Sequence, residues 1–121
     1  MKTMEKKSLE KPDETRTFPN GKMDVVKVGD VTFGRMKLMP GWKWSESVKP
    51  VAKTDSCLVP HTQYVISGRI VIRMDDGTEK EMGPGDACVV PPGHDAWVVG
   101  NEPVVAIDFT GGETYATPHK H

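Results

Sequence analysis

Glycine and proline interrupt this chain at short and regular intervals. The 121 residues include 12 glycines and 10 prolines, and the longest stretch without either between Pro19 and Pro118 is residues 51–59. That stretch is shorter than an average globular helix of about 11 to 12 residues, whereas strands average about five to six. The spacing therefore excludes a helix-built domain and predicts an all-β protein of many short strands joined by tight turns.

Charge and hydropathy restrict the partners and the compartment. The formal net charge is −1, so the chain offers no basic surface for phosphate backbones and nucleic acid is not expected as a partner. No apolar run reaches the ~18 residues of a membrane span, and the first residues lack the apolar segment of a signal peptide. We therefore expect a cytoplasmic, single-domain protein in which Cys57 and Cys88 are free thiols.

The amino-terminal segment differs from the rest in composition. Residues 1–16 carry nine charges of mixed sign and almost no apolar side chains. Such a segment buries too little surface to offset the entropy of ordering it, which predicts a mobile charged arm over residues 1–21. A segment that wraps around a dimer partner is the alternative. The barrel domain is predicted over residues 22–112, followed by a tail over 113–121 that contains His119 and His121.

Turn residues divide the rest of the chain into short apolar or alternating runs. Asp75-Asp76-Gly77 is a strong hairpin signal, and residues 42–59 are irregular enough to predict a loop or broken strand. Strands are predicted over residues 24–28, 31–39, 64–66, 69–74, 78–82, 87–90, 96–99 and 104–109. Eight or nine short strands with turns every 8 to 12 residues are typical of a sandwich or barrel.

One of these turns carries a family resemblance. The run from Gly85 to Gly93, a glycine, five residues and then Pro-Pro-Gly, resembles the second signature of the cupin superfamily, and Pro40-Gly41 with residues 64–72 resembles the first. The continuation His-Asp-Ala-Trp is similar to a small branch of single-domain cupins. The resemblance covers about residues 31–109. It implies a double-stranded β-helix, or jelly-roll barrel, and a homodimer.

The first cupin signature usually supplies three metal ligands, a His-x-His pair and a Glu. Counting back from Gly68, the Glu position is occupied by His61 and the pair positions by Asp55 and Cys57. Counting forward from Gly41 instead places Ser47 and Lys49 at the pair positions, so the register between the two counts is open.

The second signature usually supplies one more histidine. That position falls on Ala96, and a histidine stands two residues earlier, at His94. The resemblance therefore implies a metal site whose usual residues are all replaced.

The replacements still include three side chains that bind metals, Cys57, His61 and His94. Strand alternation places Asp55, Cys57 and His61 on one face unless Pro60 breaks it. A thiolate and two imidazoles favour zinc over iron or nickel, with one coordination position left open. The alternative is a metal-free barrel in which these residues pack inertly or hydrogen-bond locally. Asp95 is a candidate for orienting the ring of His94.

Aromatic side chains near the same motifs suggest a small-molecule pocket. We predict Trp44, His61, Gln63, His94 and Trp97 as ligand-binding residues, with core or dimer packing as the alternative for the tryptophans. Two functions follow. The first is a barrel that binds a small molecule at a modified divalent-metal site. The second is a metal-dependent enzyme of the isomerase, lyase or dioxygenase type, acting on a small carboxylate or sugar-like metabolite; the sequence leaves catalysis undecided.

Overall fold

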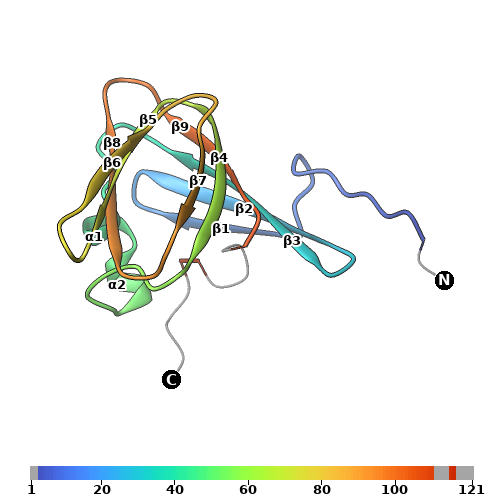
Figure 1. Ribbon diagram of the computed structural model, residues 1–121. Helices are drawn as coiled ribbons and strands as arrows, with labels where there is room; N and C mark the ends of the chain where they lie inside the picture. The colour runs from blue at the N-terminus through green and yellow to red at the C-terminus, as the bar shows by residue number, and fades with distance from the viewer. Residues whose placement is uncertain (1–2, 111–114, 117–121) are drawn as a thin grey trace.

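The fold is an antiparallel β-barrel made of two facing sheets (Figure 1). The computed structural model describes residues 3–110 and 115–116. Within these residues there are nine strands: β1 Glu14–Phe18, β2 Gly21–Val28, β3 Val31–Leu38, β4 His61–Ser67, β5 Arg69–Met74, β6 Glu79–Met82, β7 Ala87–Val90, β8 His94–Val99 and β9 Val104–Asp108. The all-β jelly-roll prediction is confirmed.

The strands divide unequally between the sheets. One sheet has six strands in the order β1-β2-β3-β9-β4-β7, and the other has three in the order β6-β5-β8. Strand β9, the last in sequence, lies between β3 and β4 and pairs antiparallel with both. The chain therefore brings residues near its carboxyl-terminal end into the middle of the larger sheet.

Alternation along the strands decides which side chains enter the barrel. In β4, β8 and β9 every second residue is buried, beginning with His61, His94 and Val104. Because successive side chains of a strand point to opposite faces, the buried set in each strand faces the interior. Most of these positions are apolar, but the inward set also contains the polar side chains of His61, Gln63, His94 and Asp108.

A tight corner shows why glycine is needed between β4 and β5. Gly68 has a φ of +77°, and a Cβ built on it would lie 2.3 Å from the carbonyl oxygen of Pro103. A side chain at this position would both strain the backbone and collide with the neighbouring chain. Gly77, in the turn predicted from the Asp-Gly pair, also has a positive φ but opens to free space.

The first strand lies where the sequence predicts a charged arm. Residues Glu14–Phe18 pair in register with β2, and Phe18 is buried in the core. An edge strand pairs through backbone hydrogen bonds on one side, so Glu14 stays exposed while Phe18 is buried and Arg16 is partly buried. The ordered sheet therefore begins at Glu14, ahead of the predicted domain start at residue 22.

The irregular segment before β4 contains two single helical turns, α1 Trp44–Ser47 and α2 Lys49–Ala52. This differs from the predicted loop or broken strand. Each turn closes two main-chain hydrogen bonds of the i to i+4 type. In α1 the N–H groups of Ser47 and Val48 donate, and in α2 those of Ala52 and Lys53 donate. Segments this short are compatible with Pro50, which divides residues 42–59 and lies in the first turn of α2, where proline is tolerated. No helix in the described residues has the length and apolarity needed to cross a membrane.

Candidate metal centre

An isolated β-bridge brings the first two metal-ligand candidates together. Cys57 precedes β4 and His94 begins β8, and the two residues pair antiparallel through hydrogen bonds in both directions, of 2.7 and 3.2 Å. Side chains of directly opposed residues in an antiparallel pair project to the same face. The bridge therefore points the Cys57 thiol and the His94 imidazole into the same end of the barrel.

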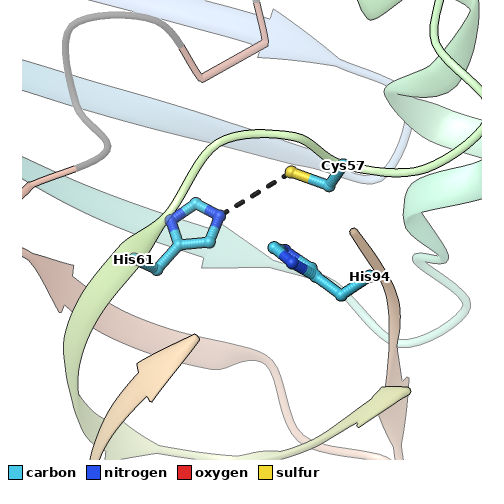
Figure 2. A group of neighbouring side chains, drawn as sticks. All are labelled: Cys57, His61 and His94. Atoms are coloured by element: carbon cyan, nitrogen blue, oxygen red, sulfur yellow. Dashed lines mark hydrogen bonds between the residues drawn. The ribbon is translucent and has the colours of Figure 1, made fainter. Parts of the chain in front are cut away.

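His61 completes the cluster from the first position of β4. Its Nε2 lies 3.8 Å from the Cys57 sulfur, and its ring centre lies 5.3 Å from that of His94 (Figure 2). The three side chains are buried, and their ligand atoms all lie within 4.8 Å of one another. Two segments far apart in the sequence, residues 57–61 and the start of β8, thus converge on one point inside the barrel.

A buried carboxylate holds the ring of His61. Its Nδ1 is hydrogen-bonded to Oδ2 of Asp108, a side chain with 0% exposure at the end of β9. Because a carboxylate only accepts, Nδ1 carries a proton, and in the neutral tautomer of this ring the lone pair is on Nε2, the nitrogen nearest the Cys57 sulfur. This arrangement of carboxylate, histidine and open nitrogen is typical of metal-binding histidines.

A different acceptor, a main-chain carbonyl, fixes the tautomer of His94 in the same way. Its Nδ1 donates to the carbonyl oxygen of Pro91 at 2.8 Å, which leaves Nε2 as the lone-pair nitrogen. Burial, together with the neighbouring His61, lowers the pKa of His94 from the usual 6.5 to about 4. The ring is therefore neutral at pH 7, the form in which imidazole binds a metal.

The donor set fits zinc. Tetrahedral zinc with Zn–S of about 2.3 Å and Zn–N of about 2.1 Å separates a sulfur from a nitrogen ligand by roughly 3.6 Å, close to the 3.8 Å between Cys57 and His61. Burial raises the pKa of the Cys57 thiol to about 12, so the metal-free site holds the proton that a metal would displace. Three protein ligands leave a fourth zinc position open.

A small cavity adjoins the two histidines. The centre of a water-sized sphere can move within about 20 Å³ inside it, which is enough space for one or two water-sized groups. Its lining is mostly apolar, with the polar atoms confined to a few side chains. The lining residues are Met36, Leu38, Trp42, Trp44, His61, Gln63, Ile70, Ile72, His94, Ala96, Val104, Ala106 and Tyr115.

Tyr115 reaches this cavity from the segment predicted as a tail. The side chain is only 2% exposed, and its ring lies edge-on to those of His61 and Phe18, at centroid distances of 5.4 and 6.1 Å. Its carbonyl oxygen accepts a 2.7 Å hydrogen bond from the guanidinium of Arg16 in β1. Strand β1 thus helps to hold an aromatic residue against the cluster. His119 and His121 lie outside the described residues.

The structure brings most of the predicted site residues together. Trp44, His61, Gln63 and His94 line the cavity, and Cys57 lies beside the histidines. Trp97 does not line it, because β8 alternation turns this residue to the face opposite His94, where the Lys43 amine lies 5.5 Å from the ring centre. That part of the predicted pocket needs correction.

Asp95 also differs from its expected role. Its Oδ1 accepts the main-chain N–H of Ser45 at 3.1 Å, so it connects β8 to α1, while the Pro91 carbonyl orients His94. Ala96, which the resemblance places at the usual histidine position, is the next inward-facing residue of β8 after His94. The imidazole of His94 therefore enters the barrel one inward-facing position before Ala96, the position at which the resemblance places the usual histidine.

Two site residues were missed by sequence reasoning, Asp108 and Tyr115. A signal existed for Asp108: it continues the inward set of Val104 and Ala106, where a carboxylate is unexpected unless it has a buried partner. No comparable signal marked Tyr115, whose position depends on contacts with β1 and β4.

Comparison with known proteins agrees with this architecture. The cupin domain family matches residues 59–110, and no curated protein matches the chain. A structure of unknown function from Rhizobium leguminosarum is similar over 98% of this chain and 100% of its own, with 21% identity and a TM-score of 0.65. A protein with a double-stranded β-helix domain from Klebsiella pneumoniae gives 89% and 84% coverage, 18% identity and a TM-score of 0.57.

A third similar structure is the polyketide cyclase RemF from Streptomyces resistomycificus, with 88% and 78% coverage, 16% identity and a TM-score of 0.59. At these identities the likeness to solved structures concerns the fold. The family match covers the strands that carry His61, His94 and Asp108, and the barrel topology extends over the remaining strands. Residues 59–110 therefore match a cupin domain, within a barrel of the double-stranded β-helix type.

Proposed function

We propose that this protein binds zinc through Cys57, His61 and His94 and holds a small molecule at the open position of the metal. The carrying observation is the hydrogen bonding of the two histidines. Each has its Nδ1 engaged by an acceptor, which leaves Nε2 as the lone-pair nitrogen, and one ligand atom of each ring lies within 4.8 Å of the other and of the Cys57 sulfur. A merely structural histidine has no need of this shared orientation.

Different residues of the chain have different roles at such a site. Asp108 and the Pro91 carbonyl hold the ring nitrogens in the binding tautomer, and burial keeps His94 neutral. Apolar side chains around the cavity limit access of water. Bound zinc would supply a Lewis acid with one exchangeable position.

We propose binding rather than a particular reaction. RemF is named as a polyketide cyclase, and another similar structure, with 22% identity over 88% of this chain, is a mutant of oxalate decarboxylase from Bacillus subtilis, of which 29% is covered. These activities belong to those proteins. What carries over is the barrel interior as a place for a small ligand.

Elemental analysis of untagged protein purified without added metal tests the metal site. We expect about one zinc per chain, lost in Cys57→Ser, His61→Ala and His94→Ala. Far-UV circular dichroism of each variant separates loss of metal from loss of fold. Wild-type protein that folds but takes up no zinc, iron or nickel, even after dialysis against each salt, would refute the proposal.

Cys88 provides a matched control for the cysteine substitution. It is half-buried in β7 and lies outside the Cys57, His61 and His94 cluster. Cys88→Ser should therefore keep the full metal content, whereas Cys57→Ser should not. Equal metal content in the two variants would exclude Cys57 as a ligand.

A further inference from the structure

The two outer faces of the barrel differ in charge. On the three-stranded sheet, outward side chains of β5 and β6 form ion pairs, Arg69 with Glu81 at 3.8 Å and Arg73 with Glu79 at 4.0 Å. This composition is expected of a face in water, since antiparallel sheets commonly turn polar residues to solvent. The outer face of β9, β4 and β7 in the six-stranded sheet is different.

The outward side chains of these three strands are uncharged, and several are large and exposed. The strands lie wholly within the described residues, and their outward set, with Phe109 directly after β9, consists of Thr62, Tyr64, Ile66, Ala87, Val89, Val105, Ile107 and Phe109. Four of these, Tyr64, Ile66, Val89 and Phe109, are 45%, 50%, 76% and 42% exposed. The register places Tyr64 beside Ile107 and Ala87, so the set is continuous; we call it the apolar sheet face.

The amino-terminal segment occupies the adjoining part of the same sheet. The Arg35 guanidinium, on the outer face of β3, donates to the carbonyl oxygen of Leu9 at 3.2 Å and to the carboxylate of Glu10. Val26, which points outward on β2, is only 2% exposed. The segment around Leu9 is therefore bound to its own sheet rather than extended toward a partner, and it leaves the apolar sheet face uncovered.

The size of the apolar sheet face matches one side of a stable interface. With full side-chain areas of roughly 150 to 250 Å², the exposed fractions of Tyr64, Ile66, Val89 and Phe109 leave about 400 Å² of apolar surface. The half-buried neighbours and the polar rim extend the face to roughly 700 Å², close to the ~800 Å² that each partner contributes to a standard-size interface. Contiguous apolar surface of this extent marks a site of protein–protein interaction.

The composition of the face indicates which partner fits it. A surface that recognises a charged partner carries complementary charges, and the outward side chains of β4, β7 and β9 carry none. An uncharged face can pack against its own copy without like-charge repulsion. Homodimer interfaces are also more apolar than those of transient complexes. The occupant that fits best is therefore a second copy of this chain.

We propose that two copies of this chain pack through the apolar sheet face about a two-fold axis, with β9 and β4 at the centre of the interface. Both partners then bury the same outward residues, so each interface side chain is covered twice in the dimer. The inference goes beyond the proposed function, because Tyr64 and Ile66 point away from the barrel interior that His61 and Gln63 face.

Sedimentation velocity of the untagged full chain over a range of concentrations tests the assembly. We expect a dimer with a Kd in the micromolar range or below, as for other interfaces of this size. One series contains a chelator and a second contains zinc. The dimer should form in both, which separates this inference from the metal site.

Substitutions on the face locate the interface. Tyr64→Lys and Val89→Lys each bring a charge into the buried area and should weaken the dimer at least about tenfold. Tyr64→Ser and Val89→Ser remove apolar area without adding charge and should weaken it less. Val51→Lys is the matched control, because Val51 is also an exposed apolar residue, at 37%, but lies in α2 outside the face; this variant should dimerise as the wild type does.

The outcomes decide whether the face is an interface. A wild-type chain that stays monomeric at the highest concentration would overturn the inference. It would also be overturned by Tyr64→Lys and Val89→Lys proteins that are folded by far-UV circular dichroism and dimerise as tightly as the wild type, or by a Val51→Lys protein weakened as much as they are. If a lysine variant does not fold, the serine variants decide the matter, since they should still dimerise more weakly than the Val51→Lys control.

Discussion

Replacing Asp108 by Asn should weaken zinc binding without unfolding the protein. The carboxylate accepts from Nδ1–H of His61 through Oδ2 and from the Thr110 main chain at 2.9 Å through Oδ1. Asn can still accept from Thr110, but its NH₂ group then faces His61. That group donates, so it favours the tautomer with the proton on Nε2, the nitrogen directed at Cys57.

The size of the effect follows from that loss of preorganisation. Substituting the hydrogen-bond partner of a metal-binding histidine typically costs about 10- to 100-fold in metal affinity, or about 1.4 to 2.7 kcal/mol. The same amount is lost from the stabilisation that saturating zinc gives the folded protein, since ligand stabilisation varies with the logarithm of concentration over Kd. Asp108→Asn should therefore lower the zinc-bound Tm more than the metal-free Tm.

Competition titration against a chromophoric zinc chelator measures the affinity, and calorimetric melting with and without zinc measures the stability difference. Asp24→Asn is the control, because Asp24 is also a buried carboxylate but pairs with Thr15 and Arg35 at the β1-β2-β3 side of the sheet. It should lose stability and keep its zinc affinity. A folded Asp108→Asn protein that binds zinc within threefold of the wild type would refute the proposed role of the carboxylate.

Three further predictions concern protons and backbone. Because the Cys57 thiol has a pKa of about 12, zinc binding must displace its proton. The apparent zinc affinity should therefore rise by about tenfold per pH unit above pH 7, as measured by chelator competition. The metal-free protein should lose up to about 3 kcal/mol of unfolding free energy as the pH falls from 6.5 to 4. In this range His94 takes up a proton in the unfolded chain but not in the folded one, where its pKa is lowered to about 4. Urea unfolding across this pH range, with a chelator present, tests whether stability falls as predicted. Gly68→Ala should destabilise the fold by well over the ~1 kcal/mol expected from positive φ alone, because its Cβ meets Pro103, whereas Gly77→Ala should show only the backbone effect; equal unfolding midpoints would contradict this account.

Local sequence patterns were enough to predict most of the barrel. Residues such as Gly68 and Gly77 define corners through positive φ, and an alternating run between corners can bury one face only as a strand. The predicted strands over residues 69–74 and 87–90 coincide with β5 and β7. The first strand escaped prediction because its pairing with β2 depends on backbone groups, which composition does not reveal.

The candidate site was predicted only in part. Cys57, His61 and His94 are recognisable as ligand types, and the inward parity of His61 and Gln63 follows from strand alternation. Trp97 illustrates the limit of such reasoning, since a motif places an aromatic residue near a site without saying which face of the strand it occupies.

The sequence by itself determined the kind of fold and the chemical types available at the site, because turn propensity and side-chain chemistry are local properties. Only the tertiary structure decided that the site is a cluster at all. The bridge between Cys57 and His94, the carboxylate that Asp108 brings to His61 from 47 residues away, and the entry of Tyr115 into the cavity are contacts between distant segments. Closure of the barrel creates these contacts, and no local pattern encodes which inward positions will meet.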